Sequence, residues 1–277
     1  MSKQFLVVGS PIDHSKSPAI HRAAYEVLGL DWTYGRLEVA KSDLRQVLDN
    51  APAALEGFSV TAPLKEEAAR HAARRDEFSE LSGAANTLVR SEEGWDAFNT
   101  DVFGIVQALR GIGVNKPNRV LLIGSGATAR SAALALRHFN IDAQIDVFAR
   151  NKVSRKELVS FLKGLGLKAR SVRSVSSSLG KVDLTISTIP AHALDATIQD
   201  LSVRKTAQIR GPLLDVAYNP WPSLAAQTWG FAGQPVASGL EMLIWQAVAQ
   251  LRIFTSGNPN QELPNEVAVV EAMRHAV

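Results

Sequence analysis

The chain has 277 residues, of which 46% are hydrophobic, 6% are aromatic and 21% are charged, and its formal net charge is +3. This length is enough for two domains with substantial cores, and the composition is typical of α/β proteins. Lysines and arginines are dispersed, which argues against nucleic-acid binding, and the chain has no cysteine for disulfides, thiolate metal sites or thiol catalysis.

The six histidines show no metal-ligand spacing, so we expect no metal site. No apolar run reaches the length of about 18 residues that a membrane-spanning helix needs, and the first residues show no charged leader or cleavage site. We therefore expect a cytoplasmic protein that does not bind membranes.

Alternating strand and helix signals fill the first hundred residues. Proline favours the first turn of a helix, and two of the expected helices begin with one. The last two strands flank a Gly-containing turn, which indicates a hairpin. Helices are expected after Pro18, at 44–48, after Pro63 and after Asp101. Strands are expected at 5–8, 32–39, 57–61, 86–90 and 95–98.

A second series of alternating strands and helices occupies the middle of the chain, which predicts a mostly parallel sheet with helices on both faces. Its strands are expected near 119–124, 143–149, 168–173, 183–188, 212–215 and 234–237. A long helix follows Gly239, and a last helix covers 265–275. The predicted fold is therefore α/β with two domains that meet across a cleft. Residues 1–101, completed by the helices of 239–277, form one domain, and residues 102–238 form a doubly wound Rossmann-type domain.

The apolar run 119–123 ends in a glycine-rich turn and continues as a helix rich in alanine and leucine. The pattern G-x-G-x-x-A is typical of a dinucleotide-binding turn. Gly124 and Gly126 let the backbone approach a pyrophosphate, and Ala129 lets the helix pack on the strand. Glycine pairs also occur at such turns for geometric reasons alone, so the pattern does not identify the ligand by itself.

The end of the next strand indicates which dinucleotide binds. An NAD site has a carboxylate about 20 residues after the glycines, and Asp146 is the candidate for that role. The strand continues beyond Asp146, however, and ends at Arg150, with Lys152 close behind. A guanidinium and an ammonium suit a 2′-phosphate, which favours NADP. Arg155 and Lys156 can also be interpreted as the solvated start of a helix.

Other polar clusters have the residue types of a substrate site. The hydroxyls of Ser15 and Ser17 lie at the start of a helix, where they suit a carboxylate, although Ser17 can also be an ordinary N-cap. Lys65 stands in the first turn of a helix, where the dipole disfavours a cation, and this suggests a function.

Three further polar positions remain open between a structural and a functional role. Asn86 and Asp101 belong to segments at the ends of expected strands, where turn or cap chemistry is also plausible. Gln246 stands among apolar neighbours on a helix and needs partners if it is buried, and a backbone carbonyl would be enough.

Taken together and in order, these segments resemble the shikimate dehydrogenase family over essentially the full chain. The resemblance implies reversible, NADPH-dependent reduction of 3-dehydroshikimate to shikimate, the fourth step of the shikimate route to aromatic amino acids. The first domain would then bind the substrate and the middle domain NADP. The segments that carry the resemblance are Ser15-Lys16-Ser17-Pro18, Val60-Thr61-Ala62-Pro63-Leu64-Lys65, Ala85-Asn86-Thr87, Asn99-Thr100-Asp101, Gly124-Ser125-Gly126 and Gly239-Leu240-Glu241-Met242-Leu243.

The resemblance also implies roles for single residues. Lys65 and Asp101 are the expected catalytic pair, in which Lys65 stabilises and protonates the alkoxide that hydride transfer creates. The substrate carboxylate is expected to contact Ser15, Ser17 and Tyr218. Ring hydroxyls are expected to contact Thr61, Asn86, Asp101 and Gln246. The residues expected to bind NADP are Gly124, Ser125, Gly126, Ala127, Thr128, Ala129, Arg150, Asn151, Lys152, Thr188, Gly239 and Met242.

The sequence departs from the family pattern at several positions. The family often has Asn where Ser59 stands, Asn-Arg-Thr at 149–151 and Asn-Ala-Thr near 186–190. It usually has a further Gly where Ala127 stands, and the restricted backbone of alanine is expected to weaken cofactor binding. Members that accept quinate often have Thr at the position of Ser17, so Ser17 favours shikimate.

Two alternative functions remain open at this point. One is a quinate/shikimate dehydrogenase that uses NAD, and the other is a non-catalytic nucleotide-binding regulatory protein of the same fold. In either case the expected partners are small molecules, and the protein is expected to be a monomer or a homodimer.

Overall fold

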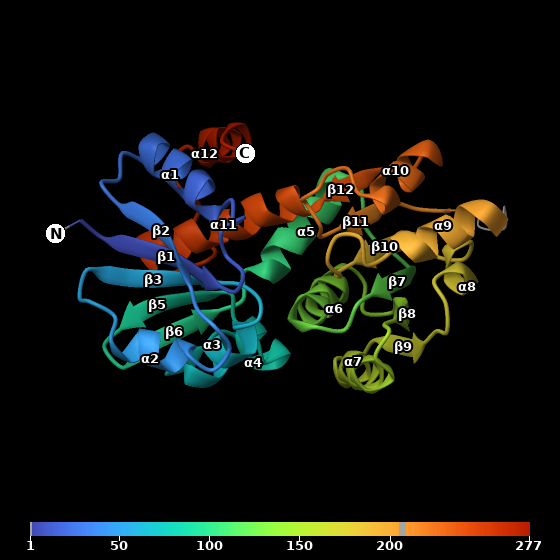
Figure 1. The fold of residues 1–277 in the computed structure, drawn as a ribbon, viewed down its shortest axis with the longest axis horizontal. Helices are drawn as coiled ribbons and strands as arrows, with labels where there is room; N and C mark the ends of the chain where they lie inside the picture. The colour runs from blue at the N-terminus through green and yellow to red at the C-terminus, as the bar shows by residue number, and fades with distance from the viewer. Residues whose placement is uncertain (1, 205–208) are drawn as a thin grey trace. The chain divides into compact units, whose positions relative to one another are not determined.

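The computed structural model describes residues 2–204 and 209–277. They form two compact units, which we call unit 1 (Met1–Gly104 with Leu243–Val277) and unit 2 (Ile105–Met242). The chain enters unit 2 within helix α5 (Asp101–Gly111) and leaves it within α11 (Gly239–Ser256). The boundaries expected from the sequence fall at the start of the same two helices. Each unit contains a six-stranded sheet (Figure 1).

The sheet of unit 1 is mixed. Its strands are β1 (Gln4–Gly9), β2 (Thr33–Glu38), β3 (Leu55–Val60), β4 (Arg74–Arg75), β5 (Thr87–Ser91) and β6 (Gly94–Phe98), in the order β2-β1-β3-β5-β6-β4. β1 runs parallel to β2 and β3, whereas β5 is antiparallel to both of its neighbours. The expected hairpin is confirmed as β5 and β6.

Helices cover both faces of this sheet. They are α1 (Ser17–Leu28), α2 (Leu44–Asp49), α3 (Lys65–His71), α4 (Glu77–Ser82), α11 and α12 (Glu266–His275). Side chains alternate between the faces of a strand. Tyr34 stacks on His21 of α1, and Phe5 packs on Phe254 of α11, with ring centroids 4.1 and 4.4 Å apart. On the other face, Val8 and Phe58 join a core cluster with residues of α2 and α3.

Two short elements of unit 1 are absent from the sequence-based prediction. β4 has two residues and α4 has six, so neither completes enough periods to be recognised from a hydrophobic pattern. The start of α4 does carry a local signal, because the carboxylate of Asp76 accepts a hydrogen bond of 2.7 Å from the backbone N–H of Ser79.

The sheet of unit 2 was predicted to be mostly parallel, and all of its strand pairs are parallel. Its strands are β7 (Arg119–Ile123), β8 (Gln144–Phe148), β9 (Lys168–Ser171), β10 (Leu184–Ser187), β11 (Leu213–Asp215) and β12 (Val236–Ser238), in the order β12-β11-β10-β7-β8-β9. This is the doubly wound order, and it reverses between β7 and β10. Ligands of such sheets bind outside the carboxyl ends of the strands at that point, where α6 begins.

Helices also cover the sheet of unit 2. They are α6 (Ala127–Phe139), α7 (Lys152–Gly164), α8 (Ser176–Leu179), α9 (Asp195–Arg204) and α10 (Leu224–Phe231). A buried cluster that includes Leu121, Ile123 and Trp229 joins the sheet to α8, α9 and α10. No helix among the described residues is long and apolar enough to cross a bilayer.

Candidate active site

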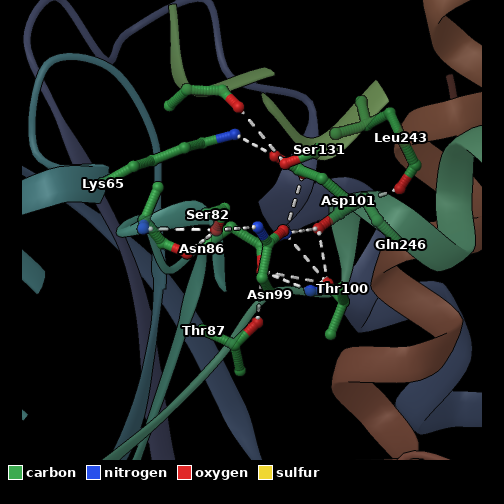
Figure 2. Close-up of polar contacts among 12 residues, drawn as sticks. Lys65, Ser82, Asn86, Thr87, Asn99, Thr100, Asp101, Ser131, Leu243 and Gln246 are labelled. Carbon is green, nitrogen blue, oxygen red and sulfur yellow. Dashed lines mark hydrogen bonds and ion pairs between the residues drawn. The ribbon is translucent and has the colours of Figure 1, made fainter. Parts of the chain in front are cut away.

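The two expected catalytic side chains form an ion pair in unit 1. Lys65 is the first residue of α3 and Asp101 is the first residue of α5. Lys65 Nζ lies 2.6 Å from Asp101 Oδ2, and the side chains are only 15% and 5% exposed (Figure 2). A cation in the first turn of a helix is unfavourable against the dipole, and the carboxylate of Asp101 compensates for this position.

Asn86 connects this pair to helix α11. Its Nδ2 group lies 2.9 Å from Asp101 Oδ1, 2.9 Å from Thr100 Oγ1 and 3.0 Å from Gln246 Oε1. Its Oδ1 accepts a hydrogen bond of 2.8 Å from the backbone N–H of Thr100. The Nε2 group of Gln246 donates to the carbonyl of Leu243 at 2.8 Å. Both roles considered for Gln246 from the sequence are therefore present. Its Nε2 group bonds a backbone carbonyl, and its Oε1 atom contacts Asn86 beside the Lys65–Asp101 pair.

Strand ends bring these residues together. Asn86 immediately precedes β5, and its backbone N–H donates to the carbonyl of Phe98, the last residue of β6. The backbone N–H of Val60, at the end of β3, donates to the carbonyl of Asn86 at 2.7 Å. The hairpin register pairs Thr87 with Phe98, so the Asn99-Thr100-Asp101 segment must leave the sheet next to Asn86.

Two of the three residues expected at the substrate carboxylate, Ser15 and Ser17, lie after β1. Lys16 is the N-cap of α1, no side chain caps this helix, and Ser17 is the first helical residue. The alternative interpretation of Ser17 as an N-cap is therefore wrong. The backbone N–H of Ser17 lies 3.4 Å from Ser15 Oγ, and the side chain of Ser17 is buried. Tyr218 belongs to unit 2, where it follows β11, and partial burial raises the pKa of its phenol.

Thr61 follows β3, and its backbone N–H donates to the carbonyl of Val8 on the neighbouring strand at 2.9 Å. The end of β1 is close to it. A Cβ atom on Gly9 would lie 2.4 Å from Thr61 Cγ2 and 2.9 Å from the carbonyl oxygen of Ala62. Only glycine therefore permits this close approach of β1 to the segment that leads from β3 to Lys65.

The sequence-based prediction missed several polar residues around Asn86. Thr100 lies inside the Asn99-Thr100-Asp101 motif but was not expected to have a role. Gln250 on α11 donates from Nε2 to the carbonyl of Asn86 at 3.1 Å and to Thr87 Oγ1 at 3.0 Å. The signal for Gln250 was present in the sequence, because it stands four residues after Gln246 and so shares its helix face.

The glycine turn of unit 2 leaves backbone exposed at the start of α6. Gly124 has a φ of +115°, and a Cβ atom there would lie 2.2 Å from Thr188 Oγ1. Gly126 is the N-cap of α6 with no side-chain cap, and a Cβ atom on it would meet no atom within 4 Å. Exposed backbone at a helix N-terminus favours phosphate groups. Ala129 is fully buried, as expected for close packing of helix on strand.

Arg150 and Asp146 occupy very different positions around β8. Arg150 is exposed just beyond the end of the strand, next to Lys152, which is also exposed. Asp146 is buried within the strand, where its carboxylate pairs with Arg170 and accepts from Ser178 Oγ, both at 2.6 Å. Burial alone would raise the pKa of Asp146, but these hydrogen bonds hold it below its usual range. The carboxylate of Asp146 is thus already bonded to other residues of unit 2. Arg150 and Lys152, whose charges fit a 2′-phosphate, remain exposed.

The other expected cofactor residues have definite local roles in unit 2. Asn151 Oδ1 caps α7 by accepting from the N–H groups of Val153 and Ser154, and Ser125 Oγ lies 2.9 Å from Ser154 Oγ. Thr188 Oγ1 donates to the carbonyl of Ile123 at 2.9 Å. A Cβ atom on Gly239 would lie 1.9 Å from the carbonyl oxygen of Val216. Met242 is buried. Thr128 lies in the first turn of α6.

The alternative interpretation of Arg155 as a solvated residue is wrong, because its Nη1 donates to the carbonyl of Val172 at 3.1 Å. Lys156 is exposed, which agrees with that interpretation. Within the described ranges, no group of three or more His, Cys, Asp or Glu side chains is arranged to hold a metal ion.

Comparisons with known proteins show which family the chain is similar to. The family model described as "Shikimate dehydrogenase substrate binding domain" matches residues 7–88, which contain Lys65 and Asn86. A curated shikimate dehydrogenase (NADP(+)) from Anaeromyxobacter dehalogenans is 32% identical over 92% of this chain and 91% of that protein. The chain belongs to the shikimate dehydrogenase family. Another family member, from Methanococcoides burtonii, is 31% identical over 94% of each chain.

Solved structures of the family superpose over the full chain. Shikimate dehydrogenase from Mycobacterium tuberculosis is 36% identical with a TM-score of 0.85, and covers 99% of this chain and 100% of that one. The enzyme from Thermus thermophilus, solved in complex with NADP(H) and shikimate, is 28% identical with a TM-score of 0.82 and the same coverage. Family membership and the α/β fold class predicted from the sequence are both confirmed.

Proposed function

We propose that this protein is an NADP-dependent shikimate dehydrogenase, which catalyses the reversible reduction of 3-dehydroshikimate to shikimate in the shikimate pathway. The observation that carries the proposal is the partly buried Lys65–Asp101 pair, whose charged atoms lie 2.6 Å apart and whose carboxylate is bonded to Asn86. Supporting it, relatives that cover nearly the whole chain are named shikimate dehydrogenase (NADP(+)), and the Thermus thermophilus structure contains NADP(H) and shikimate.

Lys65 performs the proton chemistry of this mechanism. When bound, NADPH supplies a hydride to the ketone carbon, and the carbonyl oxygen then gains negative charge. The ammonium of Lys65 stabilises that charge and donates a proton to the oxygen, so that the ketone gains one hydride and one proton and becomes an alcohol. In the reverse direction the neutral amine of Lys65 accepts the hydroxyl proton.

Asp101 and Asn86 orient the reacting groups. One carboxylate oxygen of Asp101 holds Lys65 Nζ, and the other accepts from Asn86 Nδ2. Asp101 also has lone pairs for the substrate hydroxyl next to the reacting carbon. The Nδ2 group of Asn86 has two hydrogens but three acceptors within 3.0 Å, so a ring hydroxyl can replace one of them at little cost.

The remaining proposed contacts divide between the two units. In unit 1, Ser15 and Ser17 hold the substrate carboxylate, and Thr61 and Gln246 contact ring hydroxyls. Tyr218 of unit 2 assists at the carboxylate. In unit 2, residues 124–129 form the pyrophosphate cradle, and Arg150 and Lys152 bind the 2′-phosphate of NADP. Asn151, Thr188, Gly239 and Met242 complete the proposed cofactor site.

Initial rates of oxidation of shikimate and quinate, each with NADP+ and with NAD+, test this proposal. We expect the highest kcat/KM for shikimate with NADP+. A higher value for quinate with NAD+ would identify a quinate dehydrogenase, and no activity in any combination would favour a nucleotide-binding regulatory protein. In this proposal the enzyme acts on its small-molecule substrates in the cytoplasm as a monomer or homodimer, and sedimentation of the purified chain measures which.

The role of Lys65 is tested by Lys65→Ala. We expect kcat to fall by about 100-fold or more, since general acid catalysis typically contributes factors of 100 to 10,000, with little change in the KM for shikimate. Lys41→Ala, at an exposed position of the same unit, is the matched control and should keep the wild-type rate. Near wild-type turnover in Lys65→Ala would show that another group transfers the proton.

A further inference from the structure

A line of buried side chains extends from Asn86 across unit 1, away from the Lys65–Asp101 pair. Tyr34 Oη lies 2.6 Å from Ser59 Oγ, and Ser59 Oγ lies 2.9 Å from Gln250 Oε1. Gln250 Nε2 lies 3.0 Å from Thr87 Oγ1, and Thr87 Oγ1 lies 3.0 Å from Asn86 Oδ1. The four residues come from β2, β3, α11 and β5, and all are buried.

Each hydrogen bond in this line has one possible direction. The amide oxygen of Gln250 can only accept, so Ser59 must donate to it and Tyr34 must donate to Ser59. The amide nitrogen of Gln250 can only donate, and its two hydrogens are used by Thr87 Oγ1 and the carbonyl of Asn86. Thr87 therefore donates to Asn86 Oδ1. As a result Nδ2, and not Oδ1, of Asn86 faces Asp101.

The phenol of Tyr34, at the far end of this line, is held in place and stays protonated. Its ring stacks on the buried ring of His21 with centroids 4.1 Å apart. Burial raises the pKa of Tyr34 far above its usual value, with hydrogen bonds to Ser59 and Ser17 opposing this in part, so the hydroxyl keeps its proton. Ser17 is also one of the residues proposed to hold the substrate carboxylate.

We propose that Tyr34, Ser59 and Gln250 are positioning residues for the reaction, acting through Thr87 and Asn86 to aim Asp101 and Lys65. This inference rests on the proposed function. It also assigns a role to Ser59, where the chain departs from the asparagine common in the family. The hydroxyl oxygen of Ser59 can accept a hydrogen bond from Tyr34 and donate one to Gln250. All the hydrogen bonds from Tyr34 to Gln250 therefore point the same way.

Steady-state kinetics of Tyr34→Phe and Ser59→Ala test the proposal. We expect kcat for shikimate oxidation to fall about 5- to 10-fold in each, with KM within about 2-fold of wild type. The effect is partial because the backbone N–H of Thr100 still holds Asn86 Oδ1 at 2.8 Å. The double variant should lose about as much kcat as the more severe single variant, because the effects of two breaks in the same chain of hydrogen bonds are not additive.

Tyr25→Phe is the matched control. Tyr25 is buried beside the same aromatic cluster, and its hydroxyl has no hydrogen-bond partner in the part of the chain that the structure describes. Removing that hydroxyl should leave kcat unchanged. If Tyr34→Phe and Ser59→Ala both retain kcat within 2-fold of wild type, like Tyr25→Phe, the positioning role is wrong.

The exchange of the Asn86 side-chain amide protons, followed by NMR, gives a readout that does not depend on turnover. Exchange should accelerate in Tyr34→Phe and Ser59→Ala but not in Tyr25→Phe, and unchanged exchange in the first two variants would overturn the inference. A wild-type protein that fails to oxidise shikimate would instead overturn the proposed function, so the two failures are distinguishable.

Discussion

Ala127 and Gly124 lie in the same turn but have different backbone conformations. Gly124 has a φ of +115° and no space for a Cβ atom, because Thr188 Oγ1 would lie 2.2 Å from it. Ala127 is the first residue of α6 and has no positive φ. An alanine there keeps its preferred helical conformation, so the reason for expecting weakened cofactor binding does not hold in the structure.

We therefore predict that Ala127→Gly changes the KM for NADP+ by less than about 3-fold and lowers the free energy of unfolding by up to about 1 kcal/mol, the usual preference for alanine over glycine in a helix. Gly124→Ala is the comparison at the other end of the turn, and it should impair both NADP+ binding and stability. Kinetics with varied NADP+ and urea unfolding measure these effects. A gain of 10-fold or more in apparent NADP+ affinity in Ala127→Gly would restore the original expectation.

At the scale of elements, α1 packs a titratable ring against the sheet of unit 1. His21 is fully buried, its Nδ1 lies 3.0 Å from the carbonyl oxygen of Ser17, and its ring stacks on Tyr34. Burial lowers the pKa of His21 from 6.5 to about 4. The folded protein thus binds this proton less readily than the unfolded chain, and the packing of α1 requires the neutral ring.

The contribution of His21 to stability should be lost as the pH falls. It is fully present above the unfolded pKa of 6.5 and declines until the pH passes the folded pKa of about 4. The difference between these pKa values corresponds to about 3 kcal/mol. We expect wild type to lose up to this amount more than His21→Phe between pH 7 and pH 4, measured by urea unfolding. His275→Gln, at an exposed position of α12, should keep the wild-type pH dependence. Parallel profiles of wild type and His21→Phe would contradict the assignment.

At the scale of the whole molecule, each unit has its own sheet and core, and the proposed ligands divide between them. The proposed nucleotide site consists of unit 2 residues, and the proposed catalytic pair belongs to unit 1 with most of the proposed substrate contacts. A ligand that binds only the folded state raises the melting temperature. The rise in melting temperature caused by each ligand should therefore depend on residues of the unit proposed to bind it.

We predict that NADP+ at about 100 times its Kd stabilises the protein by about 2.7 kcal/mol, which raises the Tm by several degrees. Equal concentrations of NAD+ should give a smaller shift. Arg150→Ala should lose most of the NADP+ shift while keeping the shift caused by shikimate. Lys156→Ala, an exposed cation on the following helix, is the control and should keep both shifts. A full NADP+ shift in Arg150→Ala would place the 2′-phosphate elsewhere.

Local patterns were sufficient to predict most elements and both polar motifs of the catalytic pair. Strand and helix periodicity, proline at helix starts and the glycine turn all act over a few residues, so they can be recognised without the fold. The bounds of short elements were less well predicted: β12 covers 236–238 rather than 234–237, and β4 and α4 were missed. Short elements depend on contacts with the rest of the sheet for their stability.

The sequence by itself determined the fold class, the family and the residues of the proposed catalytic pair, because motif order and hydrophobic period are properties of the chain. Tertiary structure decided which side chains remain available. It pairs Asp146 with Arg170 and Ser178, whereas Arg150 stays exposed. It also joins Ser59 to Gln250, which lie 191 positions apart. Partners so distant in the chain leave no local signal, since only the pairing of strands and the packing of α11 bring their hydrogen-bonding groups together.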